Sequence, residues 1–251
     1  MAYRPLRGFE RLGRVSARTL TRLLARRVPA RRVRRRARGY PDQVPLRLDL
    51  AEPRVDLAPL AAALAEGACA VIPTDTVYGL VCAAGQPGAC DRLSSLKGRD
   101  PRQPSTVMFA SLEAAEALLA PLAPELATRA RRLLERGATV LLPNPDRSYV
   151  HVCGDHPERI GLRVSAFPQP LAETIASAGP ILATSANVHG EPDLRTLAGV
   201  PAQISDGCAV LVDGGPAAAG RASTVLDLSA ARPVILREGA LATADALALI
   251  A

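Results

Sequence analysis

Residues 69–80 of the chain read Cys-Ala-Val-Ile-Pro-Thr-Asp-Thr-Val-Tyr-Gly-Leu. The apolar run Cys69–Ile72 predicts a buried strand that ends at Pro73. Three side chains with hydroxyl or carboxylate groups follow at once, before the phenol of Tyr78. A loop of this kind, at the carboxyl end of a strand, can present donors and acceptors to a small polar ligand. An ordinary strand-to-helix turn, with Asp75 as the helix cap, accounts for the same residues.

Outward from this stretch, short apolar segments alternate irregularly with helical patterns. Strands are predicted at 46–50, 69–72, 106–110, 139–142, 161–164, 181–184, 209–212, 224–228 and 234–236. Helices are predicted at 55–66, 86–96, after a Ser111 cap, and at 124–135, 170–177 and 243–250. Interleaving without strict alternation indicates an α/β fold with a mixed sheet. No repeat or long linker divides residues 46–251, so we expect one domain there and a separate arm at 1–45.

The composition excludes several classes of protein. Aromatic residues make up 3% and Trp is absent, which disfavours stacking platforms for single-stranded nucleic acid. Five scattered cysteines without a CxxC pair, and three histidines without ligand spacing, disfavour disulfide scaffolds and metal sites. Such cysteines suit a reducing compartment, so we expect a cytoplasmic protein. No apolar run of the length that a membrane span needs is present, so no membrane association is expected.

Positive charge is concentrated at the N-terminus. Residues 1–40 hold 14 Arg and one acidic residue, Glu10, whereas the whole chain carries +7. Residues 41–251 are therefore negative by about 6 charges. The arm is expected to be disordered or partly helical, and RNA contact through it is the functional interpretation. A solubilising tail, a misassigned start codon and an organellar transit peptide are the alternatives.

Lys97 is the one lysine beside 30 arginines. Lysine is a compact point charge, whereas arginine is a wide planar fork, so a retained lysine indicates a position where the fork does not fit. In Lys97-Gly98-Arg99 the glycine removes bulk between two cations that can bracket a polyphosphate. Chance, or a cation placed to complement a helix C-terminus, explains the same residues.

Other polar loops carry weaker signals. Thr184-Ser185-Ala186-Asn187 follows an apolar strand and suits hydrogen bonding to phosphate or ribose, or a simple Asx-turn. Asp213-Gly214-Gly215, Arg221–Thr224 and Leu236–Gly239 form a further group of polar and glycine-rich turns. All of these loops are expected at the carboxyl ends of strands. The motifs of P-loop NTPases, dinucleotide enzymes, α/β hydrolases and zincins are missing from the sequence.

Taken in order, these motifs resemble one family, the YrdC-like threonylcarbamoyl-adenylate synthases. The matching motifs are Pro-Thr-Asp-Thr-Val-Tyr-Gly-Leu (73–80), Lys-x-Arg (97–99), Thr-Ser-Ala-Asn (184–187), Ser-Thr-Val-x-Asp (223–227) and Leu-Arg-x-Gly-Ala (236–240). The first and third motifs are the specific ones, and the resemblance excludes the arm. It implies an α/β domain with a twisted, mixed, largely open sheet flanked by helices around a deep basic cleft.

The resemblance also implies an activity. Enzymes of this family combine L-threonine, bicarbonate and ATP into threonylcarbamoyl-AMP and pyrophosphate, with Mg²⁺ and without a resident metal. A partner, the tRNA threonylcarbamoyl transferase, then moves the group to adenosine 37 of tRNA. Adenylation of this kind needs cations on the phosphates and an oriented pocket, and no protein nucleophile.

Carried over by motif, the resemblance implies two sets of site residues. The nucleotide set contains Lys97, Arg99, Ser185, Asn187, Ser223 and Arg237. Within this set, Lys97 and Arg99 are the implied catalytic pair and hold the ATP phosphates. The threonine set contains Thr74, Thr76, Tyr78 and Arg163.

The chain departs from the family pattern at two places expected near the cleft. A Gly-Pro-x-Thr turn becomes Arg136-Gly137-Ala138-Thr139, and Pro-Leu after the Lys-x-Arg loop becomes Pro104-Ser105. These changes keep two alternatives open: a paralogue that uses the same cleft for another carbamoyl or nucleotide reaction, and a non-catalytic RNA-binding protein.

Overall fold

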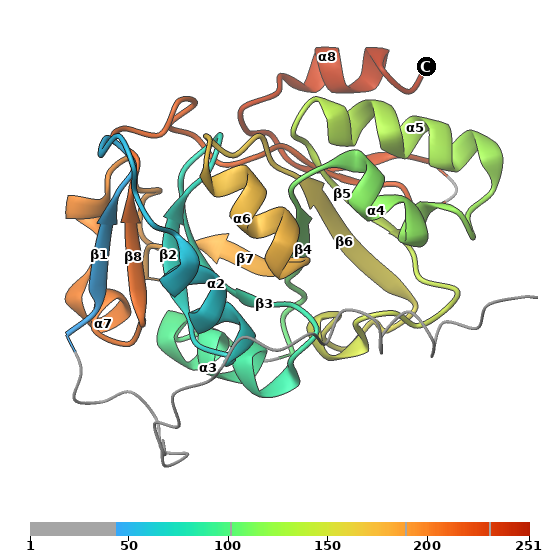
Figure 1. Ribbon diagram of the computed structural model, residues 1–251. Coiled ribbons are helices and arrows are strands. Elements are labelled where there is room, and N and C mark those ends of the chain that lie inside the picture. Colours follow the sequence, from blue (N-terminus) through green and yellow to red (C-terminus); the bar gives the residue numbers. More distant parts are fainter. Residues whose placement is uncertain (1–43, 101, 189, 231) are drawn as a thin grey trace, which may run out of the picture. The chain divides into compact units, whose positions relative to one another are not determined.

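The computed structural model describes residues 44–100, 102–188, 190–230 and 232–251 (Figure 1). The described residues, from 44 onward, group into one compact unit. The arm predicted at 1–45 falls almost entirely outside the described residues, and the arm/domain boundary stays a prediction. Among the helices of the described part, none combines the length and apolar character needed to cross a membrane.

One mixed sheet organises the described residues. Its strands are β1 (Leu46–Asp49), β2 (Ala70–Pro73), β3 (Tyr78–Ala83), β4 (Thr106–Phe109), β5 (Thr139–Pro143), β6 (Arg159–Val164), β7 (Ile181–Ser185), β8 (Val210–Asp213), β9 (Val225–Asp227) and β10 (Val234–Arg237). Their spatial order is β1-β8-β2-β3-β7-β4-β6-β5-β9-β10. The sheet contains both parallel pairs, such as β4 with β6, and antiparallel pairs, such as β3 with β7. The predicted mixed, open α/β sheet is confirmed.

Helices lie on both faces of this sheet. They are α2 (Ala58–Ala65), α3 (Pro87–Lys97), α4 (Leu112–Leu119), α5 (Pro124–Glu135), α6 (Leu171–Ala178), α7 (Ala202–Ser205) and α8 (Thr243–Ala248), with 3-10 turns η1 (Val150–Val152) and η2 (Leu197–Gly199). Local signals explain the bounds: the Ser111 hydroxyl accepts a hydrogen bond from the backbone N–H of Ala114 and caps α4, as predicted. Gly98, at φ 65°, ends α3 in the left-handed conformation that glycine adopts without strain.

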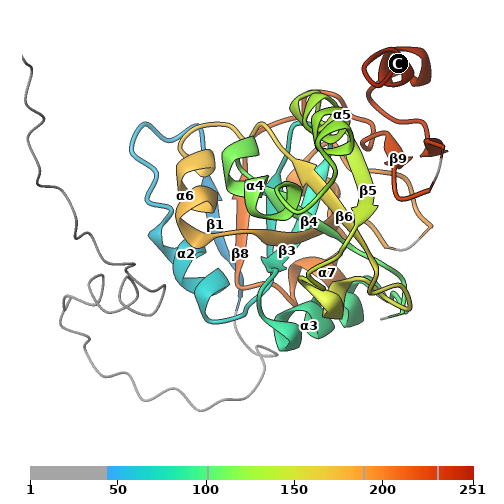
Figure 2. The same ribbon diagram turned by 90° about the vertical axis from the view of Figure 1, so that its right-hand side faces the viewer.

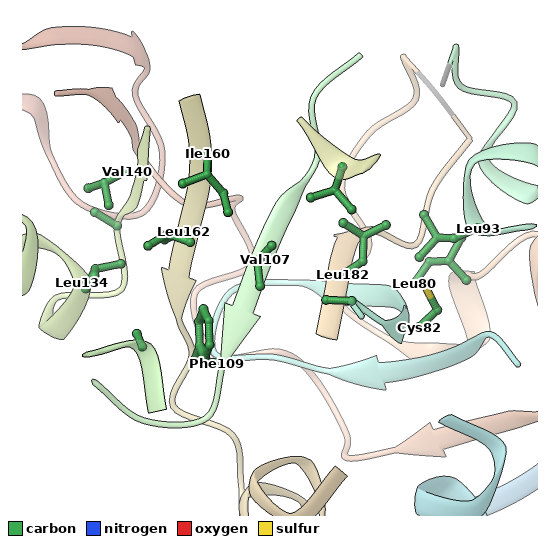
Figure 3. Close-up of a cluster of buried hydrophobic side chains, with 14 of the residues drawn as sticks. Leu80, Cys82, Leu93, Val107, Phe109, Leu134, Val140, Ile160, Leu162 and Leu182 are labelled. Atoms are coloured by element: carbon green, nitrogen blue, oxygen red, sulfur yellow. The ribbon is translucent and has the colours of Figure 1, made fainter. Parts of the chain in front are cut away.

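Two apolar clusters occupy the two faces. On one face, α2 and α6 lie side by side and cover β8, β2, β3 and β7 (Figure 1). On the other, α3 covers the β3 side and α4 and α5 cover β4, β5 and β6, as the turned view also shows (Figure 2). Figure 3 shows this second cluster, with Phe109, Leu162 and Val140 from neighbouring strands meeting Leu134 of α5.

Helices α2 and α6 cover only part of their face of the sheet. The cavity described below lies over the uncovered part of that face. Along a strand, side chains alternate between faces. In β4, Val107 and Phe109 enter the core under α4 and α5, whereas Thr106 and Met108 point to the opposite face. The strands β5 and β6 continue the pattern, with Thr139, Leu141 and Arg163 on the open side.

Two predictions about local structure were wrong. Residues 78–80 are not a loop: they begin β3, which pairs antiparallel with β2 because the turn at 74–77 reverses the chain. The Lys97-Gly98-Arg99 loop, expected like the other loops at the carboxyl end of a strand, instead lies at the end of a helix, because Lys97 is the last residue of α3. The remaining predicted strands and helices are confirmed, with ends shifted by a few residues.

Candidate active site

A cavity of about 310 Å³ opens on the uncovered half of the sheet. Seven of the predicted site residues line it: Thr74, Thr76, Arg99, Arg163, Ser185, Ser223 and Arg237. Three of these are arginines, and no Asp or Glu of the described residues belongs to the lining. The cavity lies over the face of β4, β5, β6 and β7 rather than only beyond strand ends, which differs from the sequence expectation. Its chemistry suits an anionic ligand.

Lys97 lies beside the cavity and is 3% exposed. Its ammonium donates to four oxygens: the carbonyl and hydroxyl of Ser185 at 2.6 and 3.2 Å, and the carbonyl and amide oxygen of Asn187 at 2.6 and 2.5 Å. Burial, together with the nearby charge of Arg99 and against the opposing effect of Asp193, lowers the pKa of Lys97 to about 8. The Lys97 side chain therefore extends to the end of β7, and its partners are oxygens of Ser185 and Asn187 rather than the last carbonyl groups of α3.

Ser185 and Asn187 complete this cluster. The Ser185 hydroxyl donates to the Asn187 amide oxygen at 2.5 Å, and the Asn187 amide nitrogen donates to the Glu191 carbonyl. The amide orientation is thereby fixed, with its oxygen toward Lys97. Sequence motifs separated by about 90 residues are brought together as predicted, because β3 carries the end of β7 next to α3.

Arg99 is held at the cavity wall by its own loop. Its guanidinium donates to the Pro104 carbonyl at 2.6 Å and to the Gln103 side chain at 3.1 Å. The backbone N–H of Ser105 donates to the Val152 carbonyl in η1 at 2.8 Å, which ties this loop to residues 150–153. Pro104 and Ser105, one of the two altered segments, both line the cavity.

The turn at residues 74–77 is organised by one hydroxyl. Thr74 Oγ1 donates to the Val77 carbonyl at 2.7 Å and accepts from the backbone N–H groups of Thr76 and Val77 at 3.2 Å. Thr74 and Thr76 are 6% and 3% exposed, and their hydroxyls lie 3.1 Å apart. Both side chains therefore present a fixed hydroxyl edge to the cavity.

Asp75 is not a helix cap, because it pairs with Arg163 of β6. The Arg163 Nη2 lies 2.8 and 3.0 Å from the two carboxylate oxygens, and the Ser165 hydroxyl donates to the same carboxylate at 2.6 Å. Gly137, in the other altered segment, approaches this carboxylate so closely that an added Cβ would lie 3.0 Å from it. Arg163 is 5% exposed, and its Nε has no hydrogen-bond partner. Buried donors without a partner are uncommon in folded proteins.

Arg237 and Ser223 meet at the far wall. Arg237 donates from Nε and Nη2 to the Ser223 carbonyl at 3.1 and 2.9 Å, and the Ser223 hydroxyl lies 2.8 Å from that of Thr139. The backbone of Gly239 packs directly against residue Ala222 at this wall. A Cβ at position 239 would lie 2.1 Å from the Ala222 carbonyl oxygen, so this close packing requires glycine. Thr139, Ser105 and Thr184 are lining residues that the motif argument did not assign.

Tyr78 is the one predicted threonine-side residue that does not line the cavity. Alternation along β3 directs Gly79 toward the cavity and Tyr78 toward the opposite face, where the ring is fully buried. Its hydroxyl donates to the Gly215 carbonyl at 2.8 Å, and Asp213 Oδ1 lies 3.2 Å from the same hydroxyl. Burial raises the pKa of Tyr78 to about 12. The expected contact with the cavity was wrong, and Tyr78 instead fixes the loop after β8.

The described residues contain no group of three or more His, Cys, Asp or Glu side chains arranged to hold a metal ion. Asp75, the carboxylate behind the cavity wall, is already engaged by Arg163 and Ser165. The donors that face the cavity are cations and hydroxyls, which do not fit a protein-bound divalent ion.

Comparison with known proteins gives one consistent family. The family model Sua5_yciO_yrdC, described as telomere recombination, matches residues 62–239. A Bacillus subtilis relative named threonylcarbamoyl-AMP synthase is 34% identical over 184 residues, which cover 73% of this chain and 53% of the relative. A Chromohalobacter salexigens relative of the same name is 32% identical over 172 residues, 68% of this chain and 92% of the relative. The chain thus spans about half of the first relative and nearly all of the second.

A solved structure agrees with these relatives. The crystal structure of P. abyssi Sua5 complexed with L-threonine matches with a TM-score of 0.65 and 28% identity, over 78% of this chain and 58% of that one.

Proposed function

The chain belongs to the Sua5/YciO/YrdC family, and we propose that it works there as an L-threonylcarbamoyladenylate synthase. The reaction joins L-threonine, bicarbonate and ATP into threonylcarbamoyl-AMP, and releases pyrophosphate and water. The observation that carries the proposal is the cavity wall: three arginines and no carboxylate among the described lining residues, with Lys97 buried beside it. Each substrate of this reaction bears a carboxylate, a carbonate or a phosphate.

The nucleotide side is proposed to consist of the Lys97, Arg99, Ser185 and Asn187 cluster, with Ser223 and Arg237 at the far wall. The Lys97 ammonium already has four oxygen partners, so a phosphate oxygen would replace one of them. Arg99 lines the cavity with its fork held by backbone and Gln103 oxygens. Both cations are therefore fixed before the nucleotide arrives, which lowers the ordering cost of binding.

The threonine side is proposed to consist of Thr74, Thr76 and Arg163. The Thr76 hydroxyl is proposed to hydrogen-bond the small polar side chain of the amino acid, while Thr74, whose hydroxyl is engaged by the backbone of the turn, holds Thr76 in place. The guanidinium of Arg163, which lines the cavity, is proposed to face a carboxylate or carbamate oxygen. The P. abyssi structure with L-threonine supports an amino-acid site in this fold.

The chemistry then follows from position and charge. The threonine nitrogen attacks bicarbonate carbon and water leaves, which forms a carbamate. A carbamate oxygen attacks the α-phosphorus of ATP, and the bond to the pyrophosphate oxygen breaks. Charge builds on the leaving pyrophosphate, where Lys97 and Arg99 would stabilise it. No side chain needs to form a bond to substrate.

Mg²⁺ is proposed to enter with ATP as part of the substrate. Magnesium commonly keeps several waters and is held through substrate phosphates rather than by a protein cage. This route agrees with the cation-lined wall, and no step above depends on a protein-bound ion.

The test is release of pyrophosphate by the purified chain with ATP, bicarbonate and single amino acids. We expect release only when L-threonine and bicarbonate are both present. Equal turnover with serine or glycine, or without an amino acid, would replace this proposal with a paralogue that uses the cavity for another reaction. ATP hydrolysis without any adenylate would do the same.

Two partners are proposed beyond the substrates. The product is a reactive mixed anhydride, so a tRNA threonylcarbamoyl transferase must consume it before it hydrolyses. RNA contact is proposed for the arm, because residues 1–40 carry 14 Arg and a single acidic residue. Binding of tRNA by the full chain should fall steeply with salt, and a chain starting at residue 41 should lose most of it. Salt-insensitive binding, or equal binding by both chains, would rule the arm out.

A further inference from the structure

The connection between β5 and β6 runs through residues 144–158, none of which lines the cavity. Two of its residues have left-handed backbones although neither is glycine: Arg147 at φ 52° and Tyr149 at φ 50°. A side chain other than glycine pays a free-energy cost in this conformation, and it persists only where the surroundings impose it. The connection therefore needs contacts that hold it in this shape.

Asn144, the first residue of the connection, is 4% exposed and supplies those contacts. Its amide nitrogen donates to the carbonyls of Ser148 and Pro157 at 2.8 and 3.1 Å, and its amide oxygen accepts from the Ser148 backbone N–H at 3.0 Å. Aspartate has the same shape but no donor, so it would place an oxygen against two carbonyl oxygens. One amide thus ties the two ends of the connection together and fixes the turn that contains Arg147 and Tyr149.

The 3-10 turn η1 follows the two left-handed residues and contacts two other parts of the molecule. His151 Nε2 lies 2.7 Å from the carbonyl oxygen of Ala84, the residue after β3, so η1 is anchored at the end of that strand. The Val152 carbonyl accepts a hydrogen bond from the backbone N–H of Ser105 at 2.8 Å. The connection therefore reaches the loop that carries Arg99, from the side away from the cavity.

Residues 102–105 of that loop are held between the connection and Arg99. Gly154, at φ 62°, approaches so closely that an added Cβ would lie 2.0 Å from the Arg102 carbonyl oxygen. On the other side, the Pro104 carbonyl accepts from Arg99 Nη2 at 2.6 Å, and Pro104 lines the cavity together with Arg99. A shift of the connection would therefore displace the carbonyl that holds the guanidinium at the cavity wall.

We propose that Asn144 is a positioning residue for the nucleotide: it holds the 144–158 connection in its strained shape and thereby fixes Arg99 at the cavity wall. Asn144 does not line the cavity, so its effect passes through the hydrogen bond between Val152 and Ser105. The effect on ATP rests on the proposed function. The coupling between the connection and Ser105 does not, because it concerns contacts within the protein alone.

Hydrogen exchange measured by NMR tests the coupling without any substrate. In Asn144→Asp the backbone N–H of Ser105 should exchange about tenfold faster than in the wild type, as expected when buried groups lose a partner. Asn144→Ala, which loses the same donors without adding a charge, should give the same pattern. The N–H of Ser165, which donates to the Phe109 carbonyl at the other end of β4, should keep its rate in both variants. Ser148→Ala, which keeps both backbone groups that Asn144 holds, should match the wild type. An unchanged rate at Ser105, or equal acceleration at Ser105 and Ser165, would overturn the proposal.

Steady-state kinetics tests the consequence for the nucleotide. Asn144→Asp should raise KM for ATP by about tenfold and leave KM for threonine within about twofold of the wild type, because Arg163 is held by Asp75 instead. In an Arg99→Ala background the same substitution should raise KM for ATP by less than about twofold, since two changes that act through one contact are not additive. An equal rise in both KM values, or the full effect in the Arg99→Ala background, would overturn the positioning role. If the wild type releases no pyrophosphate, the proposed function fails while hydrogen exchange still decides the coupling.

Discussion

Lys97 and Arg163 are both buried cations at the same cavity, and they differ in what holds them. The four partners of Lys97 are neutral oxygens from Ser185 and Asn187. Arg163 pairs through Nη2 with both oxygens of the Asp75 carboxylate. Lys97 thus keeps its positive charge for a ligand, whereas the charge of Arg163 is largely neutralised before any ligand binds.

The difference separates two ways of binding an anion. An uncompensated ammonium attracts charge, so it suits phosphates on which negative charge grows during the reaction. A neutralised guanidinium offers directed donors at a fixed angle, so it suits recognition of one particular group. We therefore expect changes at Lys97 to act on the chemical step, and changes around Arg163 to act on amino-acid binding.

The largest expected effect comes from Lys97. Both Lys97→Ala and Lys97→Arg should lower kcat/KM for ATP by about 10²–10³, the cost of losing one preorganised contact to a developing charge. Arginine fails because its five donors do not fit the oxygens that now surround the compact ammonium. Steady-state pyrophosphate release measures the loss, with thermal melting to show that each variant folds.

A surface arginine provides the matched control. Arg102, which pairs with Asp100 outside the cavity, should tolerate replacement by lysine or alanine without loss of rate. If Lys97→Arg keeps most of the wild-type rate, a point charge is not needed, and the contrast with Arg163 disappears.

The next effect is expected at Asp75. Asp75→Asn keeps the shape but removes the charge that holds Arg163, so we expect KM for threonine to rise by about tenfold to thirtyfold, as for loss of a charged hydrogen bond. The kcat value at saturating threonine should change much less. A merely structural role would instead lower the fraction of active protein and leave KM unaltered, so the split between KM and kcat decides the role.

Both cations were named from the sequence, but only the neighbours of Lys97 were foreseen and the carboxylate partner of Arg163 was not, for a physical reason. Lys97, Ser185 and Asn187 lie at element ends, where polar residues after apolar runs are visible in the sequence. The pairing of Asp75 with Arg163 depends on strand order, because about 90 residues separate them and three strands lie between β2 and β6 in the sheet. No local pattern encodes that order.

The position of the cavity was hidden for a related reason. Met108 and Leu141 line it, yet they are apolar like the core residues beside them. Alternation predicts that such residues face away from Val107 and Val140, but not whether a helix covers the face on which they lie. Whether a strand face is covered depends on helix placement, which the hydrophobic pattern of the strand does not contain.

A pH profile gives a smaller effect that still tests the contrast. Free Lys97 loses its proton as pH passes about 8, so ATP affinity should fall by about fivefold between pH 7 and 9, while threonine affinity at the Arg163 side should hold. The free energy of unfolding should change in the opposite direction. Between about pH 8 and 10.5 Lys97 binds more protons in the unfolded chain than in the folded one. The wild type should therefore become more stable relative to Lys97→Met as the pH rises. Isothermal titration and melting measure the two trends, and parallel trends would contradict the assignment.

The smallest expected effect is at Ser165, which contacts the carboxylate but not Arg163. Ser165 is fully buried, and its hydroxyl donates to Asp75 Oδ1 at 2.6 Å. Ser165→Ala removes one hydrogen bond and leaves both Arg163 contacts in place, so the carboxylate can still neutralise the guanidinium but is less firmly oriented. Because both Arg163 contacts remain, the loss should lie at the low end of the range for one hydrogen bond, about 0.7 kcal/mol, so KM for threonine should rise by about threefold, well below the effect of Asp75→Asn. Ser165→Thr, which keeps the hydroxyl, should recover most of the affinity if its methyl group fits. An effect as large as that of Asp75→Asn would mean that orientation, rather than neutralised charge, is what distinguishes Arg163 from Lys97.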